Sequence, residues 1–161
     1  MNEASEKFIQ QMTHPLKSRV FLLLKLPAAF FSGVRIKSIT SESCEVTVPY
    51  KWFSHNPFRS TYFACLAMAA EMSTGVLCLQ QIVERMPAVS MLVVSLEANY
   101  FKKAVDLTTF TCEDGKLIEA LVDEAIATGE ARSIKAKSVG RNKAGEIVAE
   151  FFITWSFKAK R

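Results

Sequence analysis

Hydrophobic and polar residues alternate along six stretches of the chain, a period of two that predicts β-strands. The last stretch shows the pattern without a fault, because every second residue from Ile147 to Phe157 is apolar. Turn-forming residues separate the stretches, which favours three antiparallel hairpins. Their strands are expected at residues 33–39 with 44–50, 89–100 with 105–112, and 130–139 with 146–157.

Three further segments have the pattern of helices. Two short helices are expected between residues 3 and 26, at 3–12 and 15–26, and Pro27 is expected to end the second. Segment 116–127 is amphipathic and stops near Gly129. Its inward-facing residues are expected to be Leu117, Leu121 and Ile126.

The segment at about 60–83 is a fourth helix, and it holds a single charged residue, Glu71. A helix that is apolar on nearly every face is enclosed on most sides by other elements. Gln80 and Gln81, together with the central carboxylate, favour a core helix over a membrane span. The order of elements predicts an α+β domain over residues 1–161, in which an antiparallel sheet wraps around one long buried helix.

The composition fits a folded domain with an extra apolar surface. Half of the 161 residues are hydrophobic and 22% are charged, which excludes a disordered chain. The mean hydropathy of +0.16 suggests a buried interface or a ligand cavity. No charge occurs from Met86 to Leu96, so this strand is either central in the sheet or pairs with a second subunit. We favour pairing, and therefore a homodimer.

The cysteines and the N-terminus bear on the compartment. Four cysteines without a CxxC spacing predict no metal site and reduced, mostly buried thiols. The first residues lack the basic start of a signal peptide, and a cytoplasmic protein is expected.

Positive charge is concentrated at the C-terminal end. The net charge is +4, whereas residues 132–161 hold eight basic and two acidic residues. Such an end can attract phosphates, and the simpler alternative is a solvated strand face with a basic terminus. A nucleic-acid or membrane partner is not expected.

Glu71 is the first candidate for chemistry. A buried carboxylate either finds hydrogen-bond donors or has a raised pKa, and both suit a general base or a nucleophile. The residues on its helical face are small, which leaves either a groove beside the carboxylate or a close helix–sheet contact. They are Ala64, Ala67, Gly75 and Cys78.

The loop before this helix is the second candidate. Asn56 and Pro57 form a turn, and Ser60 or Thr61 is a plausible N-cap. Free N–H groups at the helix start could hold a developing oxyanion, although every helix start offers such donors.

The segment NPFRSTYFACLAMAAE and the order of elements resemble the hot-dog fold of the thioesterase-like superfamily. In its phenylacetyl-CoA type of acyl-CoA thioesterase, a loop Asn precedes a His-Gly-Gly helix start and then a helix Asp or Glu. Asn56 and Glu71 match that spacing, and Tyr62, Phe63 and Ala64 occupy the His-Gly-Gly positions. The resemblance runs from about residue 20 to the end. It is strongest to an uncharacterised bacterial branch that shares FFSGVRI and VPYKWFSHNPF.

The resemblance implies a homodimer, or a pair of dimers, that hydrolyses an acyl-CoA or acyl-carrier thioester without a metal or a cofactor. Glu71 is then the base or nucleophile, and Asn56 orients water or substrate. The N–H groups near Phe63 and Ala64 form the oxyanion hole. Phe63 replaces a glycine and could block the approach of a carbonyl.

Further substrate contacts are expected at Tyr62 and Ala67, beside an apolar slot for the acyl chain. Ser90 or Ser95 is the counterpart of a Ser or Thr at the start of the third strand in some relatives. Phosphates of coenzyme A are expected to meet the basic C-terminal strands at Arg132, Lys135 and Lys137. The alternative function is a hot-dog module without catalysis that binds an acyl chain or lipid, or only dimerises.

Overall fold

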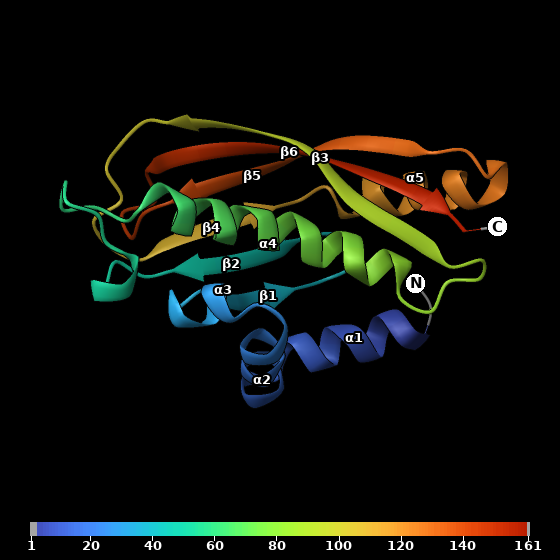
Figure 1. Cartoon of the computed structure of the whole chain (residues 1–161), viewed down its shortest axis with the longest axis horizontal. Coiled ribbons are helices and arrows are strands. Elements are labelled where there is room, and N and C mark those ends of the chain that lie inside the picture. The colour runs from blue at the N-terminus through green and yellow to red at the C-terminus, as the bar shows by residue number, and fades with distance from the viewer. Residues whose placement is uncertain (1–2, 161) are drawn as a thin grey trace.

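A six-stranded antiparallel sheet curves around the long helix α4, Phe63–Ile82, in the computed structural model, which describes residues 3–160 (Figure 1). The other helices are α1 (Glu3–Thr13), α2 (Pro15–Lys25), α3 (Pro27–Phe31) and α5 (Gly115–Thr128), with a 3-10 turn η1 at Trp52–Ser54. The strands are β1 (Arg35–Ile39), β2 (Cys44–Val48), β3 (Val89–Tyr100), β4 (Thr108–Cys112), β5 (Arg132–Arg141) and β6 (Ile147–Ala159). This mixed α+β arrangement is the hot-dog fold that the sequence resemblance implied.

The strand order is β1-β2-β4-β5-β6-β3, so β1 and β3 are the two edges. The first and third predicted hairpins are confirmed as β1–β2 and β5–β6. The second hairpin is wrong, because β3 pairs with β6 and β4 lies between β2 and β5. Alternation predicts which face a side chain occupies but not which strand lies beside it. The twelve residues of β3 instead match the long strand β6, from Val89 opposite Ala159 to Tyr100 opposite Ala149.

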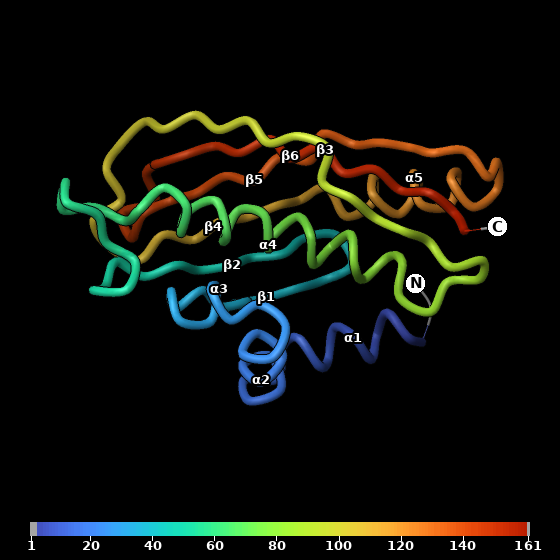
Figure 2. Tube along the Cα trace, viewed as in Figure 1, coloured from blue at the N-terminus to red at the C-terminus, as the bar shows by residue number. Residues whose placement is uncertain are grey.

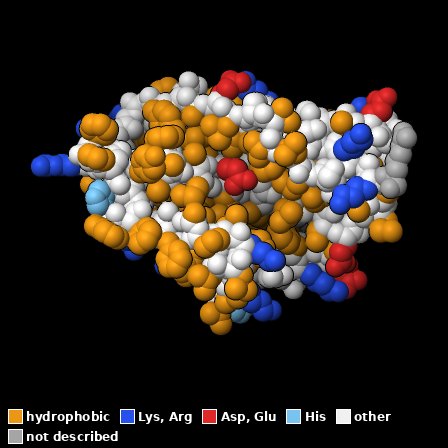
Figure 3. Space-filling model, viewed as in Figure 1, with side chains coloured by type: hydrophobic (Ala, Val, Ile, Leu, Met, Phe, Trp, Pro, Cys, Tyr) orange, Lys and Arg blue, Asp and Glu red, His pale blue; other side chains and the backbone are white. Residues whose placement is uncertain are grey.

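Helix α4 packs one side against the sheet and leaves the other side partly open. Its residues Ala69, Ala70, Leu77 and Cys78 are fully buried. By length and composition α4 could cross a membrane, but most of it is buried as the core helix of the domain. The helix is enclosed on most sides, as predicted, and its open side carries the half-buried residues Ala64, Ala67, Glu71 and Gly75. Figure 3 shows an acidic group amid hydrophobic side chains on this open face.

Two local expectations need correction. Pro27 begins the extra helix α3 rather than only ending α2, since proline is favoured in the first turn of a helix. In α5, Leu117 is 54% exposed, whereas the neighbouring Ile118 is buried with Val122 and Ala125. Leu121 and Ile126 pack against the core as expected, so the correction concerns Leu117 alone. The four cysteines are free and buried, as expected.

The two ends of the molecule differ. Figure 2 shows the loop of residues 51–62 at one end of α4 and the turn of residues 83–88, which leads into β3, at the other. The loop end is the end at which α4 starts, so the free backbone donors of the helix lie there.

Candidate active site

The loop before α4 is held in shape by Asn56. Its side-chain oxygen accepts hydrogen bonds from the N–H groups of Phe58 (3.0 Å) and Ser60 (3.2 Å) and from the Ser60 hydroxyl (3.2 Å). The Asn56 N–H donates to the Ser60 carbonyl (2.9 Å), which closes the turn. The carbonyl side of the Asn56 amide is therefore occupied by the loop, and only its NH₂ side is available to another group.

The first turn of α4 keeps two backbone donors free. Neither Ser60 nor Thr61 is the N-cap; Tyr62 is, and no side chain caps the helix. The N–H groups of Cys65 and Leu66 both donate to the Tyr62 carbonyl. Within residues 3–160, the N–H groups of Phe63 and Ala64 make no hydrogen bond. The helix dipole adds positive potential at this point, so the pair is suited to hold an oxyanion.

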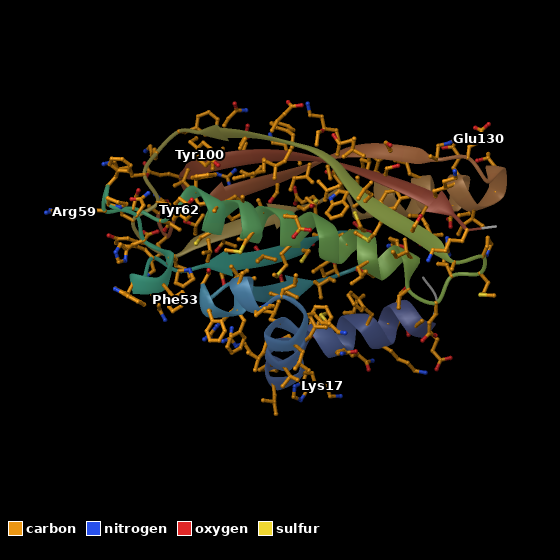
Figure 4. All side chains as sticks on the ribbon, viewed as in Figure 1. Lys17, Phe53, Arg59, Tyr62, Tyr100 and Glu130 are labelled. Carbon is orange, nitrogen blue, oxygen red and sulfur yellow. The ribbon has the colours of Figure 1, made fainter. Side chains whose placement is uncertain are left out.

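A pocket of about 740 Å³ opens beside this helix start. One wall is the loop 55–63 with Leu66, and the other is the segment 100–104 that follows β3. A hydrogen bond from the Thr61 N–H to the Ala104 carbonyl (2.7 Å) joins the two walls. Figure 4 shows Tyr62 and Tyr100 at this end of the molecule, with Arg59 projecting from the loop tip. The pocket is mostly apolar, with His55, Lys102 and Lys103 as its basic groups.

Glu71 lies farther along α4, on the open face. Its carboxylate oxygen Oε1 is beside Gly75, since a Cβ at that glycine would stand 3.0 Å from it and 3.1 Å from the Trp155 ring. Trp155 is fixed in turn by a hydrogen bond from its Nε1 to the Thr74 hydroxyl (2.9 Å). Among the described residues, no side chain or backbone group pairs with the Glu71 carboxylate. Burial raises the pKa of the Glu71 carboxyl above its ordinary value, which brings it closer to neutral pH.

The structure does not bring Glu71 into the pocket of its own chain. Phe63 and Glu71 are eight residues apart in α4, which corresponds to a rise of about 12 Å. The half-buried Ala64 and Ala67 lie between them on the open face. Cys78, expected on the same face, is fully buried instead.

Ser90 and Ser95 lie on the opposite face of the sheet from α4. Their partners on β6 are Lys158 and Thr154, whereas the inward residues of β6 include Ile153 and Trp155. Ser95 donates to the Thr154 hydroxyl (2.9 Å), and Ser90 donates to the Lys158 carbonyl (3.0 Å). Neither hydroxyl therefore faces Glu71.

The three predicted phosphate-binding residues are engaged by acids of the same chain. Arg132 pairs with Glu124 (2.7 Å) and Glu130 (3.0 Å), Lys135 with Glu97 (2.8 Å), and Lys137 with Glu150 (2.8 Å). Lys135 and Lys137 also flank the Phe152 ring on the outer face. Sequence reasoning missed Lys102 and Lys103, although the run YFKKA after β3 places two cations beside two aromatic residues. Arg161, the last basic residue, lies outside the described residues.

Metal ligands are not gathered at any point of residues 3–160, where no group of three or more His, Cys, Asp or Glu side chains is placed to hold an ion. The chemistry available along α4 is that of the Glu71 carboxylate and, at the helix start, of backbone donors.

The curved sheet around α4, with free donors at the helix start, defines a hot-dog domain. The chain belongs to the family described as a domain of unknown function, DUF4442, whose model matches residues 17–157. A search of curated proteins finds no match.

Solved structures share the fold. A Pseudomonas aeruginosa protein described as a probable thioesterase has a TM-score of 0.76 at 20% identity, covering 93% of this chain and 99% of its own. A Chlorobaculum tepidum protein of unknown function has a TM-score of 0.76 at 17% identity, covering 97% and 94%. A Haemophilus influenzae thioesterase has a TM-score of 0.62 at 14% identity, covering 87% and 88%. At these identities the likeness establishes the fold alone.

Proposed function

We propose that the protein is a thioesterase that hydrolyses an acyl-CoA or acyl-carrier thioester. The observation that carries this proposal is Glu71, an unpaired half-buried carboxylate with a raised pKa on the open face of the central helix. A general base works best when its pKa lies near the working pH. The thioesterase descriptions of two proteins that share the fold support the same class of reaction.

The reaction begins when Glu71 takes a proton from a water molecule. The water oxygen attacks the thioester carbonyl carbon, and the carbonyl oxygen becomes an oxyanion held by the N–H groups of Phe63 and Ala64. The intermediate then collapses, the C–S bond breaks, and the leaving thiolate takes the proton back from Glu71. The products are a carboxylic acid and a free thiol. Attack by Glu71 itself on the carbonyl carbon is the second route open to this carboxylate.

The separation of about 12 Å between Phe63 and Glu71 supports a site that is built from two chains. One carbonyl group cannot contact both groups of a single helix. We propose a homodimer in which each pocket receives Glu71 of the partner subunit. Strand β3 is the free edge through which the dimer forms, since Leu92, Val94 and Leu96 are 68%, 60% and 45% exposed on it.

The substrate's phosphates are proposed to meet His55, Lys102 and Lys103. These residues line the pocket, whereas Lys135 and Lys137 lie on the outer face of the sheet. Lys102 pairs with Glu146 (2.5 Å), as Lys135 and Lys137 pair with acids, whereas Lys103 has no acidic partner among the described residues. Tyr62, Phe63 and Leu66 supply the apolar wall for the start of the acyl chain.

Acyl-CoA hydrolysis by the wild type and by Glu71→Gln tests the function. Loss of a general base should lower turnover by about 10²- to 10⁴-fold while the fold persists. Glu113→Gln, the same change at an exposed position, is the matched control and should retain activity. Equal turnover of the wild type and Glu71→Gln would exclude this mechanism.

Subunit mixing tests the shared site. Glu71→Gln and a variant with a blocked pocket are each inactive alone, but a mixed dimer contains one intact site. Random reassortment should therefore restore about a quarter of wild-type activity. Activity that stays absent after verified exchange of subunits would show that each site belongs to one chain.

The second candidate function is an acyl- or lipid-binding module. It is favoured by Phe63, whose ring is 57% exposed and packs on Tyr62 with ring centroids 4.9 Å apart where relatives carry glycine. Binding of acyl-CoA without turnover on any chain length would support it.

A further inference from the structure

Helix α2 has its apolar face turned outward. It buries only Ser18 and Leu22, while Leu16 is 68% exposed and Leu24 is 72% exposed. Val20 and Leu23 complete a stripe at helical spacing, which we call the α2 stripe. A helix at the edge of a soluble domain normally presents the reverse pattern. The stripe therefore needs a partner outside the chain.

Aromatic side chains extend the α2 stripe across α3 and η1. Phe31 stacks on Phe53 with ring centroids 6.0 Å apart, and Phe53 packs edge-on against Trp52 at 5.4 Å. These rings are 55%, 58% and 79% exposed. Figure 4 shows Phe53 and Lys17 on the same side of the molecule. We call the α2 stripe with these three rings the α2 face.

The charge of this region has one sign. Residues 8–41 contain five Lys and Arg residues and no Asp or Glu. At 100° per residue, Lys17 and Arg19 lie on the two flanks of the α2 stripe. Long basic side chains beside an apolar stripe are typical of helices that lie in the surface of a bilayer, where the charged ends reach the headgroups.

One of these cations, Arg19, has an unsatisfied hydrogen-bond donor. The buried Arg19 nitrogen Nη1 makes no hydrogen bond within the described residues, and the guanidinium stacks on the Phe30 ring at 3.9 Å. Burial, and then the charge of Arg35, lower the pKa of Arg19. Both arginines line a small pocket of about 270 Å³ under α2, together with Lys37. A phosphate group would satisfy Arg19 and reduce this repulsion.

We propose that the α2 face docks onto a bilayer of anionic phospholipid, with the apolar residues in the interface and the basic residues at the phosphates. A second copy of the chain fits less well, because a two-fold interface would pair this patch with itself, so that positive charge faces positive charge. The α2 face adjoins β1, at the opposite sheet edge from β3, so docking leaves the proposed dimer edge free. This inference goes beyond the proposed hydrolysis and departs from the expectation that no membrane is involved.

Tryptophan fluorescence with vesicles gives the first test. Trp52 is 79% exposed and Trp155 is 4% exposed, so the emission should shift to the blue on binding through Trp52 alone. The vesicles contain phosphatidylcholine with or without about a third phosphatidylglycerol. Binding is expected only to the anionic vesicles, and the shift should vanish in Trp52→Phe. Absence of binding to anionic vesicles at low salt overturns the proposal.

Sedimentation of variants with the same vesicles gives the second test. Lys25, the exposed last residue of α2, is the second lysine of this helix. Lys17→Gln with Lys25→Gln should weaken partitioning by about 30-fold, because each basic residue near the surface contributes a factor of about five. The control is Lys158→Gln with Lys160→Gln, the same charge change at the C-terminal end of β6, which lies away from α2 (Figure 1). Equal losses in the two double variants would overturn the proposal.

A matched apolar pair completes this test. Leu24→Gln should reduce partitioning by at least about tenfold, because it removes an apolar group from the interface. Leu117→Gln, at an exposed leucine of α5, should not change it. A changed oligomeric state in Leu24→Gln with no change in vesicle binding would identify a protein interface instead. Because none of these measurements uses hydrolysis, their outcome is separate from that of the thioesterase proposal.

Discussion

A proline at position 63 removes one proposed oxyanion donor without breaking the helix. Phe63 is the first residue of α4, where proline is favoured, and its N–H makes no hydrogen bond in the described chain. Tyr62 before it has φ −61° and ψ 133°, the extended conformation that a residue before proline adopts. Phe63→Pro therefore requires no backbone change. Phe63→Ala is the matched control, because it removes the same ring and keeps the N–H.

The magnitude follows from the role assigned to the N–H. Loss of one oxyanion donor lowers kcat by about 10²- to 10³-fold, or about 3–4 kcal/mol of transition-state stabilisation. Both variants lose the contact of the Phe63 ring with Tyr62, a term of about 1 kcal/mol that cancels between them. Phe63→Pro should thus be at least about 100-fold slower than Phe63→Ala, at similar thermal stability. Phe63→Ala should match or exceed the wild type, since the pocket becomes more open.

The assay is release of free thiol from an acyl-CoA under saturating substrate, with a thermal melt of each variant. If Phe63→Pro and Phe63→Ala turn over at the same rate while both remain folded, the start of α4 does not hold the oxyanion. The proposed geometry of the site is then refuted, even if Glu71→Gln is inactive.

Three other predictions concern the carboxylate and the pocket. Gly75→Ala should lower kcat several-fold, because the new Cβ would crowd Glu71 at 3.0 Å and Trp155 at 3.1 Å. The stability should change little, since alanine favours the helix by about 1 kcal/mol. An unchanged kcat would argue against a catalytic role for the position of the Glu71 carboxylate. Glu71→Gln should melt at a higher temperature than the wild type near neutral pH. The raised pKa of Glu71 means that its contribution to stability is complete below the unfolded-state pKa and is lost as pH rises through the folded-state pKa. Melting curves across pH should show the gap closing in acid, and a constant gap contradicts this. Lys103→Gln should raise KM for acyl-CoA most strongly at low salt. Lys135→Gln should leave KM unchanged, because Lys135 is already paired with an acid. Equal effects of the two changes on KM would show that the pocket does not bind the phosphates.

The sequence predicts which segments form strands and helices better than it predicts which strands lie side by side. Alternation along 89–100 gives β3 with its bounds, because side-chain direction is a local property of a strand. The pairing of β3 is not local, because its partner β6, which matches it in length, begins some fifty residues later in the chain. The same limit applies to the predicted phosphate contacts. Lys135 and Lys137 look free in the sequence, but their acidic partners Glu97 and Glu150 come from other strands.

The part of the candidate site that is local in sequence could be predicted, and the part that comes from a distant segment could not. Asn56 and Glu71 are near in sequence, and the resemblance depends on their spacing. The second wall of the pocket, residues 100–104, comes from beyond β3 and has no local signal apart from its paired aromatic and basic residues. The outward stripe of α2 was hidden as well, because a hydrophobic pattern gives the apolar side of a helix but not which side faces the core.

Three features that are unfavourable in a single chain become consistent in a dimer. An edge strand with exposed Leu92 and Val94 invites pairing, a half-buried carboxylate at Glu71 lacks a donor, and the donors at Phe63 lack an acceptor. Pairing along β3 would cover the exposed edge strand. It would also bring the Glu71 carboxylate of one chain near the Phe63 donors of the other chain. In the proposed dimer each Glu71 meets the helix start of the other chain, so the rise of about 12 Å along α4 sets how the two helices lie. Covering the open face would also remove water from Glu71 and raise its pKa further. The dimer would therefore both complete the site and adjust its base, and a monomeric variant should lose turnover even with every residue of the site intact.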